Sequence, residues 1–179
     1  MTLDEAKLQA EQYGTLLHGL RLKVDARRRV ALACFAIAQQ HHSAILILMD
    51  RPAPLHATAF ALLRPLMEAT LRGEWVLHCA SDEQVTNFAL GGRSQMDMAS
   101  VIRALEKLHP ESEAHRILYQ DNWKIFSAYT HTYEHQVQHW LADAEVCPSY
   151  RPDQIAWLLN AGTNCFRLCV SSVQSMVAQ

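Results

Sequence analysis

The sequence predicts an all-α protein, a single helical bundle of about seven helices that occupies residues 1–179 and has a proline-kinked central helix. Three observations support this prediction. Only six of the 179 residues are glycine, apolar residues recur at the three- and four-residue spacing of a helix face, and no stretch shows the sustained two-residue alternation of a half-buried strand. The length suits one domain with its own core.

The first half of the chain predicts four helices. Residues 3–20 carry apolar side chains on one side, and a second helix follows over residues 25–49. Three arginines in the first turns of the second helix oppose its dipole, so we expect the two helices to run on without a clean break. Residues 55–80 are apolar nearly all round, which is typical of a central helix. Ser81 begins an S-x-x-Q capping box, which predicts a fourth helix that ends near Leu90.

Pro65 lies inside the predicted central helix and should kink it. Proline has no amide hydrogen, so the carbonyl of Ala61 loses its helical donor, and the pyrrolidine ring presses on the preceding turn.

The second half of the chain predicts further helices. The first spans 94–109. The next spans 111–126, and it continues or restarts through a histidine-rich segment to 142. A loop over 143–152 precedes a final helix over 153–176, which Asp153 caps.

Charge and cysteine content favour a cytoplasmic protein. The formal charge is −2 and the isoelectric point about 6.5, so nucleic acid is not a favoured partner, although a dimer could build a local basic cleft from Arg27 to Arg29. The number of cysteines, five, is odd, and the chain has no C-x-x-C motif. Both are expected for free thiols in a reducing compartment. The acidic, polar start is not a signal peptide, and polar residues interrupt both long apolar stretches, so we expect no membrane span.

The segment 127–140, SAYTHTYEHQVQHW, contains H-x-x-E-H from His131 to His135. On one helix His131, His135 and His139 would share a face, and two histidines at this spacing bind zinc in the inverted zincin motif, with Glu134 as the base. A catalytic zinc also needs a third protein ligand, and the downstream chain offers one glutamate, in a loop. Zinc or another divalent metal at His131 and His135 is therefore one interpretation. Histidines that are partly exposed or hydrogen-bonded within an interface, without any cofactor, are the interpretation we favour.

A column of charge runs along the predicted central helix, where Arg64, Glu68 and Arg72 follow one another at four-residue spacing. Charges on an apolar helix must be paired or line a cavity, because an unpaired buried charge costs several kcal/mol. A closed Arg–Glu–Arg ladder that fixes helix packing is the interpretation we favour. In the other interpretation, Glu68 orients the two guanidinium groups so that they grip a carboxylate or phosphate.

The stretch from Arg64 to Trp75 reads R-P-L-x-E-A-x-x-R-G-x-W, and it is followed by S-x-x-x-H-T at 127–132 and P-x-Y at 148–150. This pattern resembles a signature of small all-helical bacterial proteins of unknown function. These proteins are distantly similar to the HEPN-like helical bundles of toxin and phage-defence systems, some of which are ribonucleases. The resemblance implies that the following residues converge on one pocket: Arg64, Glu68, Arg72, Ser127 and His131.

The arginine–histidine motif of HEPN ribonucleases, R-x(4–6)-H, preferably has a polar residue after the arginine. The chain has three spacing matches, at 51–56, 72–78 and 103–109, but the residues after the arginines are proline, glycine and alanine. The motif therefore does not point to nuclease activity.

The leading functional hypothesis is a homodimeric regulatory protein of a bacterial stress or defence system that binds a protein partner or a small anionic ligand. The dimer is expected because the long helices over 25–49 and 55–80 carry more apolar area than one thin bundle easily covers. The alternatives are a HEPN-like ribonuclease and a metal-dependent hydrolase that uses His131 and His135. A pocket that holds both Arg64 and His131 would favour ligand binding or catalysis, and a closed ladder would favour a structural role.

Overall fold

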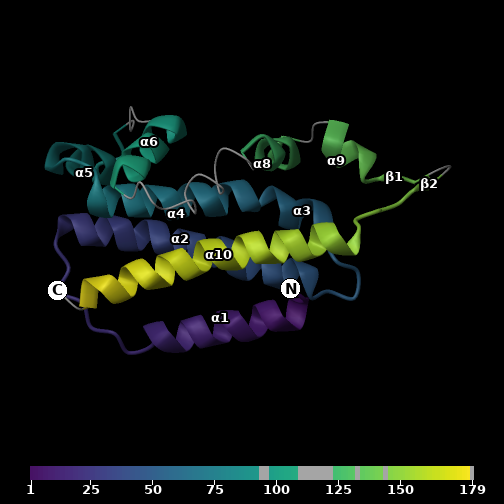
Figure 1. Ribbon diagram of the computed structural model, residues 1–179, viewed down its shortest axis with the longest axis horizontal. Helices are drawn as coiled ribbons and strands as arrows, with labels where there is room; N and C mark the ends of the chain where they lie inside the picture. The colour runs from purple at the N-terminus through teal and green to yellow at the C-terminus, as the bar shows by residue number, and fades with distance from the viewer. Residues whose placement is uncertain (93–96, 109–122, 132–133, 143–144, 178–179) are drawn as a thin grey trace.

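Three helices form the centre of the bundle in the computed structural model, which describes residues 1–92, 97–108, 123–131, 134–142 and 145–177. α2 (Ala26–Met49) packs along α4 (Leu63–His78), and α10 (Pro152–Val177) packs against both of them. α1 (Leu3–Leu17) lies along α10 and α2 (Figure 1). The prediction of an all-α bundle is confirmed.

Shorter helices continue α4 or lie on the side of the bundle away from α1, as Figure 1 shows. They are α3 (His56–Ala61), α5 (Asp82–Ala89), α6 (Met98–Leu108), α8 (Trp123–Thr130) and α9 (Glu134–Gln138). α5 and α6 lie at one end of α4, and α8 lies near the other end beside α3. A hairpin of β1 (Leu141–Ala142) and β2 (Glu145–Val146) pairs Leu141 with Val146 and projects from the bundle.

The core is built from the facing sides of the three central helices. Phe35 of α2, Leu66 and Trp75 of α4 and Phe166 of α10 are all buried in it. By length and composition α2 is the one helix among the described residues that is apolar enough to cross a membrane, and the core helix of a soluble protein passes the same test. In this structure α2 packs against α4 and α10.

The expectation that the first two helices run on without a break is wrong. α1 ends at Leu17, and Gly19 adopts a left-handed conformation with a φ of 75°. The carboxylate of Asp25 then accepts a hydrogen bond of 2.8 Å from the amide of Arg28 and caps α2. Glycine just beyond a helix end and aspartate at the N-cap are both strong local signals, and together they outweigh the unfavourable arginines in the first turn.

The central helix is interrupted three residues before Pro65. α3 ends at Ala61 and α4 starts at Leu63, with Leu62 between them. Because Pro65 has no amide hydrogen, the Ala61 carbonyl needs another donor. The hydroxyl of Thr130 in α8 donates to it over 3.3 Å and also donates to the carbonyl of Phe126 over 2.9 Å. The proline therefore creates both the predicted kink and a point of attachment for α8.

The histidine-rich segment is not the single helix expected from the sequence. α8 ends at Thr130, His131 lies in a turn, and α9 spans only Glu134–Gln138 before the hairpin begins. Part of the predicted loop over 143–152 is strand β2, and α10 starts at Pro152 rather than after an Asp153 cap, because proline suits the first helical position. The predicted starts at 94 and 111 lie outside the described residues.

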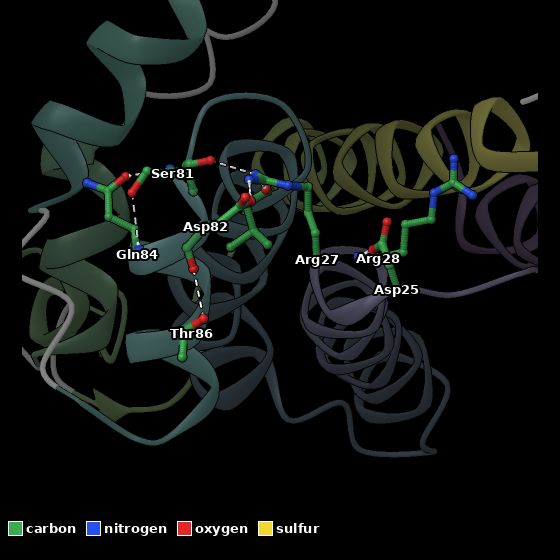
Figure 2. A network of polar contacts seen from close by, with 9 residues as sticks. Asp25, Arg27, Arg28, Ser81, Asp82, Gln84 and Thr86 are labelled. Carbon is green, nitrogen blue, oxygen red and sulfur yellow. Dashed lines mark hydrogen bonds and ion pairs between the residues drawn. The ribbon is translucent and has the colours of Figure 1, made fainter.

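Arg27 joins three helix ends at the far end of α4 (Figure 2). Its Nη1 donates to the carbonyls of Val76 and Ala80 over 2.7 and 2.6 Å, and its Nη2 lies 2.7 Å from Asp82 Oδ1 at the start of α5. A cation that binds the last carbonyls of a helix stabilises the negative end of its dipole. Ser81 caps α5 with the predicted capping box, in which its hydroxyl accepts from the amide of Gln84.

Candidate functional site

A polar cluster forms where α8 crosses α4, and the guanidinium of Arg64 is at its centre. Nε of Arg64 donates to Glu68 Oε1 over 2.9 Å. Nη1 donates to Ser127 Oγ over 3.2 Å and lies 2.9 Å from His131 Nε2. These four residues are called the Arg64 cluster below. Arg64 and Glu68 come from α4, Ser127 comes from α8, and His131 follows directly after α8.

Local structure explains why these side chains meet. Arg64 and Glu68 are four residues apart on one helix, a spacing that brings an ion pair together. Ser127 and His131 have the same spacing, and the amide of His131 donates to the Ser127 carbonyl over 3.1 Å, which continues the helical pattern past the end of α8. The hydrogen bond from Thr130 to the carbonyl of Ala61 holds this end of α8 against the kink.

The cluster is open to solvent on one side. The side chains of Arg64 and Glu68 are 24% and 30% exposed, and His131 is exposed. Because a guanidinium only donates, His131 Nε2 accepts from Nη1 in this arrangement. The formal charges of Arg64 and Glu68 then cancel. The cluster can therefore hold a ligand mainly through directed hydrogen bonds, at a surface that is only partly exposed to water.

Arg72 does not join the cluster. Within the described residues it makes no hydrogen bond to Glu68, and its buried Nη1 has no hydrogen-bond partner there. Its positive charge instead acts on the Cys34 thiol of α2. Two helical steps of four residues rotate a side chain by about 80° around the axis, so Arg72 faces a different neighbour from Arg64. The closed Arg–Glu–Arg ladder that we favoured is thus not formed among the described residues.

The metal interpretation loses the continuous helix on which it was based. His131 lies in a turn, α9 starts at Glu134, and the side chain of His135 is outside the described part of the structure. Within the described residues no group of three or more histidine, cysteine, aspartate or glutamate side chains is placed to hold a metal ion. A metal at His131 and His135 stays a prediction, and His131 Nε2 is already bonded to Arg64.

His139 belongs to an aromatic cluster, in line with the interface interpretation of the histidine run. Its ring stacks on Tyr150 with the centroids 4.7 Å apart, and its Nε2 lies 3.1 Å from the hydroxyl of Tyr129 and 3.4 Å from Gln154 Nε2. Burial raises the pKa of Tyr129 to about 12, so this hydroxyl keeps its proton and donates. A pocket of about 390 Å³ between α8 and α10 lies beside it and is lined in part by Tyr129, Gln154 and Trp157.

Sequence reasoning missed a second polar group on α4, at Glu74. Only 7% of Glu74 is exposed, and the Ser172 hydroxyl of α10 donates a hydrogen bond to its Oε1. His78 lies one turn further on, with its Nε2 3.7 Å from Glu74 Oε2. Burial raises the pKa of the Glu74 carboxyl, and the Ser172 hydrogen bond lowers it by less. The spacing of Glu74 and His78 was the available signal.

Residues 35–176 match the model of a family described as a family of unknown function (DUF6988). The chain belongs to this family. The matched DUF6988 region contains the whole Arg64 cluster and the aromatic cluster around His139. No curated protein and no solved structure matches the chain. The DUF6988 match agrees with the expected uncharacterised family, whereas the HEPN likeness stays a prediction.

Proposed function

We propose that this protein is a non-catalytic binding protein and that its Arg64 cluster binds a small anionic ligand through a carboxylate or phosphate group. The observation that carries the proposal is the position of the Arg64 guanidinium. Glu68 holds its Nε edge, while Nη1 is directed at Ser127 and His131 on another element. The regulatory role expected for a bacterial stress or defence system would consist of responding to such a ligand.

The arrangement suits an oxyanion for three reasons. A guanidinium fixed at one edge loses little freedom when it binds, and charge-assisted hydrogen bonds to oxyanions are about twice as strong as neutral ones. The Ser127 hydroxyl is a second donor at the same point. The cluster opens to solvent at His131, which is exposed, so an oxyanion can reach the guanidinium from this side.

The same contacts favour binding over catalysis. A histidine that acts as a general base needs its free lone pair near the proton it removes. The Nε2 lone pair of His131 instead faces the Arg64 guanidinium at 2.9 Å, and Ser127 Oγ accepts from the same nitrogen, Nη1. This geometry does not activate Ser127 as a nucleophile.

Titration with inorganic phosphate at constant ionic strength tests the proposal, with the imidazole resonances of His131 followed by NMR. We expect a saturable shift in the wild type and binding weakened about tenfold or more in Arg64→Gln, because hydrogen bonds to charged groups contribute about 1.5–3 kcal/mol. Glu68→Gln keeps the acceptor for Nε but removes a negative charge, so it should tighten binding a few-fold.

Arg151→Gln is the matched control, because Arg151 is also paired with a nearby carboxylate, that of Asp153, outside the cluster. It should bind phosphate like the wild type. Equal weakening in Arg64→Gln and Arg151→Gln would show a response to net charge alone and contradict the proposal. So would the absence of any saturable shift of His131 in the wild type.

A further inference from the structure

A second open site lies near the end of α4 that is away from α8, in a groove of about 500 Å³ between α2 and α5. Its walls are almost entirely apolar, with Val30, Ala33 and Ile37 on α2 and Phe88 on α5. Cys34 lies in it as a buried thiol, and burial raises the pKa of that thiol, so it carries no charge near neutral pH. Among the residues that the structure describes, Arg29 is the one charged side chain in the lining.

Three consecutive arginines at the start of α2 have different surroundings. Arg27 is held by two carbonyls and Asp82, and Arg28 donates from Nη1 to the Lys23 carbonyl over 3.1 Å. Figure 2 shows the first reaching towards α5 and the second pointing away from it. Arg29 is exposed and makes no hydrogen bond or ion pair within the described residues. Its guanidinium is thus available to a ligand at the groove.

We propose that the α2–α5 groove binds an amphipathic anion, a saturated acyl chain with a carboxylate head, with the chain along the apolar walls and the carboxylate on Arg29. Arg29, Ala33 and Ile37 succeed one another at four-residue spacing, so the line they form is about 12 Å long at 1.5 Å per residue. That length suits a medium-chain acyl group. The volume is also within the usual range of small-molecule sites.

Each half of the ligand has a matching feature. Methylene groups gain free energy on leaving water for the apolar walls, and each one buried should tighten binding about three- to fourfold. A carboxylate accepts two parallel hydrogen bonds from a guanidinium, a geometry that a hydroxyl head cannot reproduce. The groove shares no residue with the Arg64 cluster, so variants of one site test one proposal and leave the other site unchanged.

Isothermal titration with laurate below its micellar concentration, with decanoate and dodecanol as comparison ligands, tests this assignment. We expect the wild type to bind laurate more tightly than decanoate. Arg29→Gln should bind laurate about tenfold more weakly than the wild type does. Dodecanol affinity should be the same in both proteins. Arg28→Gln is the matched control, since it removes the same charge one residue away and should leave laurate binding unchanged, as should Arg64→Gln.

Ala33→Glu is a second variant at an exposed helical position, where glutamate is a good helix former. It places bulk and negative charge in the groove and should abolish laurate binding, with an unchanged circular dichroism spectrum as the check on folding. Equal losses in Arg29→Gln and Arg28→Gln would overturn the proposal. A wild type that sediments as a dimer, binds no laurate and becomes monomeric in Ala33→Glu would overturn it in favour of a second copy of the chain.

Discussion

Two carboxylates on α4 show how position on one helix decides what a polar group does. Glu74 faces α10, is 7% exposed and is bonded to Ser172. Glu68 faces α8, and its side chain is 30% exposed and paired with Arg64. The first lies in the interior layer formed by α2, α4 and α10, and the second belongs to the Arg64 cluster. The second is the more exposed to solvent, so we expect the interior polar group to act on stability and propose that the cluster groups act on binding.

Two histidines repeat this contrast. His42 of α2 is 1% exposed, stacks on Phe166 with the ring centroids 5.0 Å apart, and lies 3.4 Å from Thr163 Oγ1. His131 is exposed and bonded to Arg64. The interior histidine is thus fixed by packing on α10, whereas the cluster histidine is placed where a ligand can meet it.

The largest expected effect concerns acid stability and comes from His42. Burial lowers the pKa of His42 to about 4 from an ordinary value of 6.5. The unfolded chain therefore binds a proton at His42 below pH 6.5, whereas the folded protein binds it only below about pH 4. The free energy of unfolding should fall by about 3 kcal/mol as the pH is lowered from 6.5 to about 4. Above pH 6.5 the contribution of His42 to stability is complete.

Urea unfolding at pH 7, 5.5 and 4 measures this loss. His42→Gln cannot titrate and should show a much shallower pH dependence than the wild type. His41→Gln is the neighbouring control, because His41 is only partly buried and should leave most of the slope in place. A wild-type slope in His42→Gln would assign the acid sensitivity to other groups.

The next effect compares two helical glycines. A Cβ at Gly73 would clash with Cε1 of Phe35, whereas a Cβ at Gly14 of α1 meets nothing within 4 Å. Gly73→Ala should lower the free energy of unfolding by about 1–3 kcal/mol, because the interior layer is already closely packed there. Gly14→Ala should raise it by up to about 1 kcal/mol through helix propensity. Thermal or urea unfolding of both variants decides, and a stabilised Gly73→Ala would mean that Phe35 moves aside freely.

The smallest effect concerns the contact that holds α8 near the Arg64 cluster. Thr130→Val removes the donor to the Ala61 carbonyl and should cost about 1 kcal/mol in unfolding free energy. Thr86→Val is the control, since Thr86 donates to the carbonyl four residues back, as Thr130 does, but lies exposed on α5. Urea unfolding should show almost no change in the control. Equal costs in the two variants would mean that the cross-helix bond contributes nothing.

Much of the fold followed from local signals in the sequence. Ser81 and Gln84 form the predicted capping box, and Pro65 interrupts the central helix as expected, because caps and prolines act on backbone groups within one turn. The predictions failed where local signals competed or were weak. Asp25 and Gly19 separate two helices that the arginines had suggested were continuous, and the histidine-rich segment folds as α8, a turn and the short α9.

The sequence by itself determined the all-helical class and most boundaries of the long helices, because periodicity and capping are properties of short stretches. It pointed to the residues of the candidate site only through a resemblance to a family. Only the tertiary structure shows the contacts by which Arg64 meets Ser127 and His131, which are 63 and 67 residues away in the chain. It also decided that Arg72 points elsewhere and that Arg29, unlike its two neighbours, is available at a groove. Such choices depend on which helices pack together, and no local pattern encodes the rotation of one helix against another.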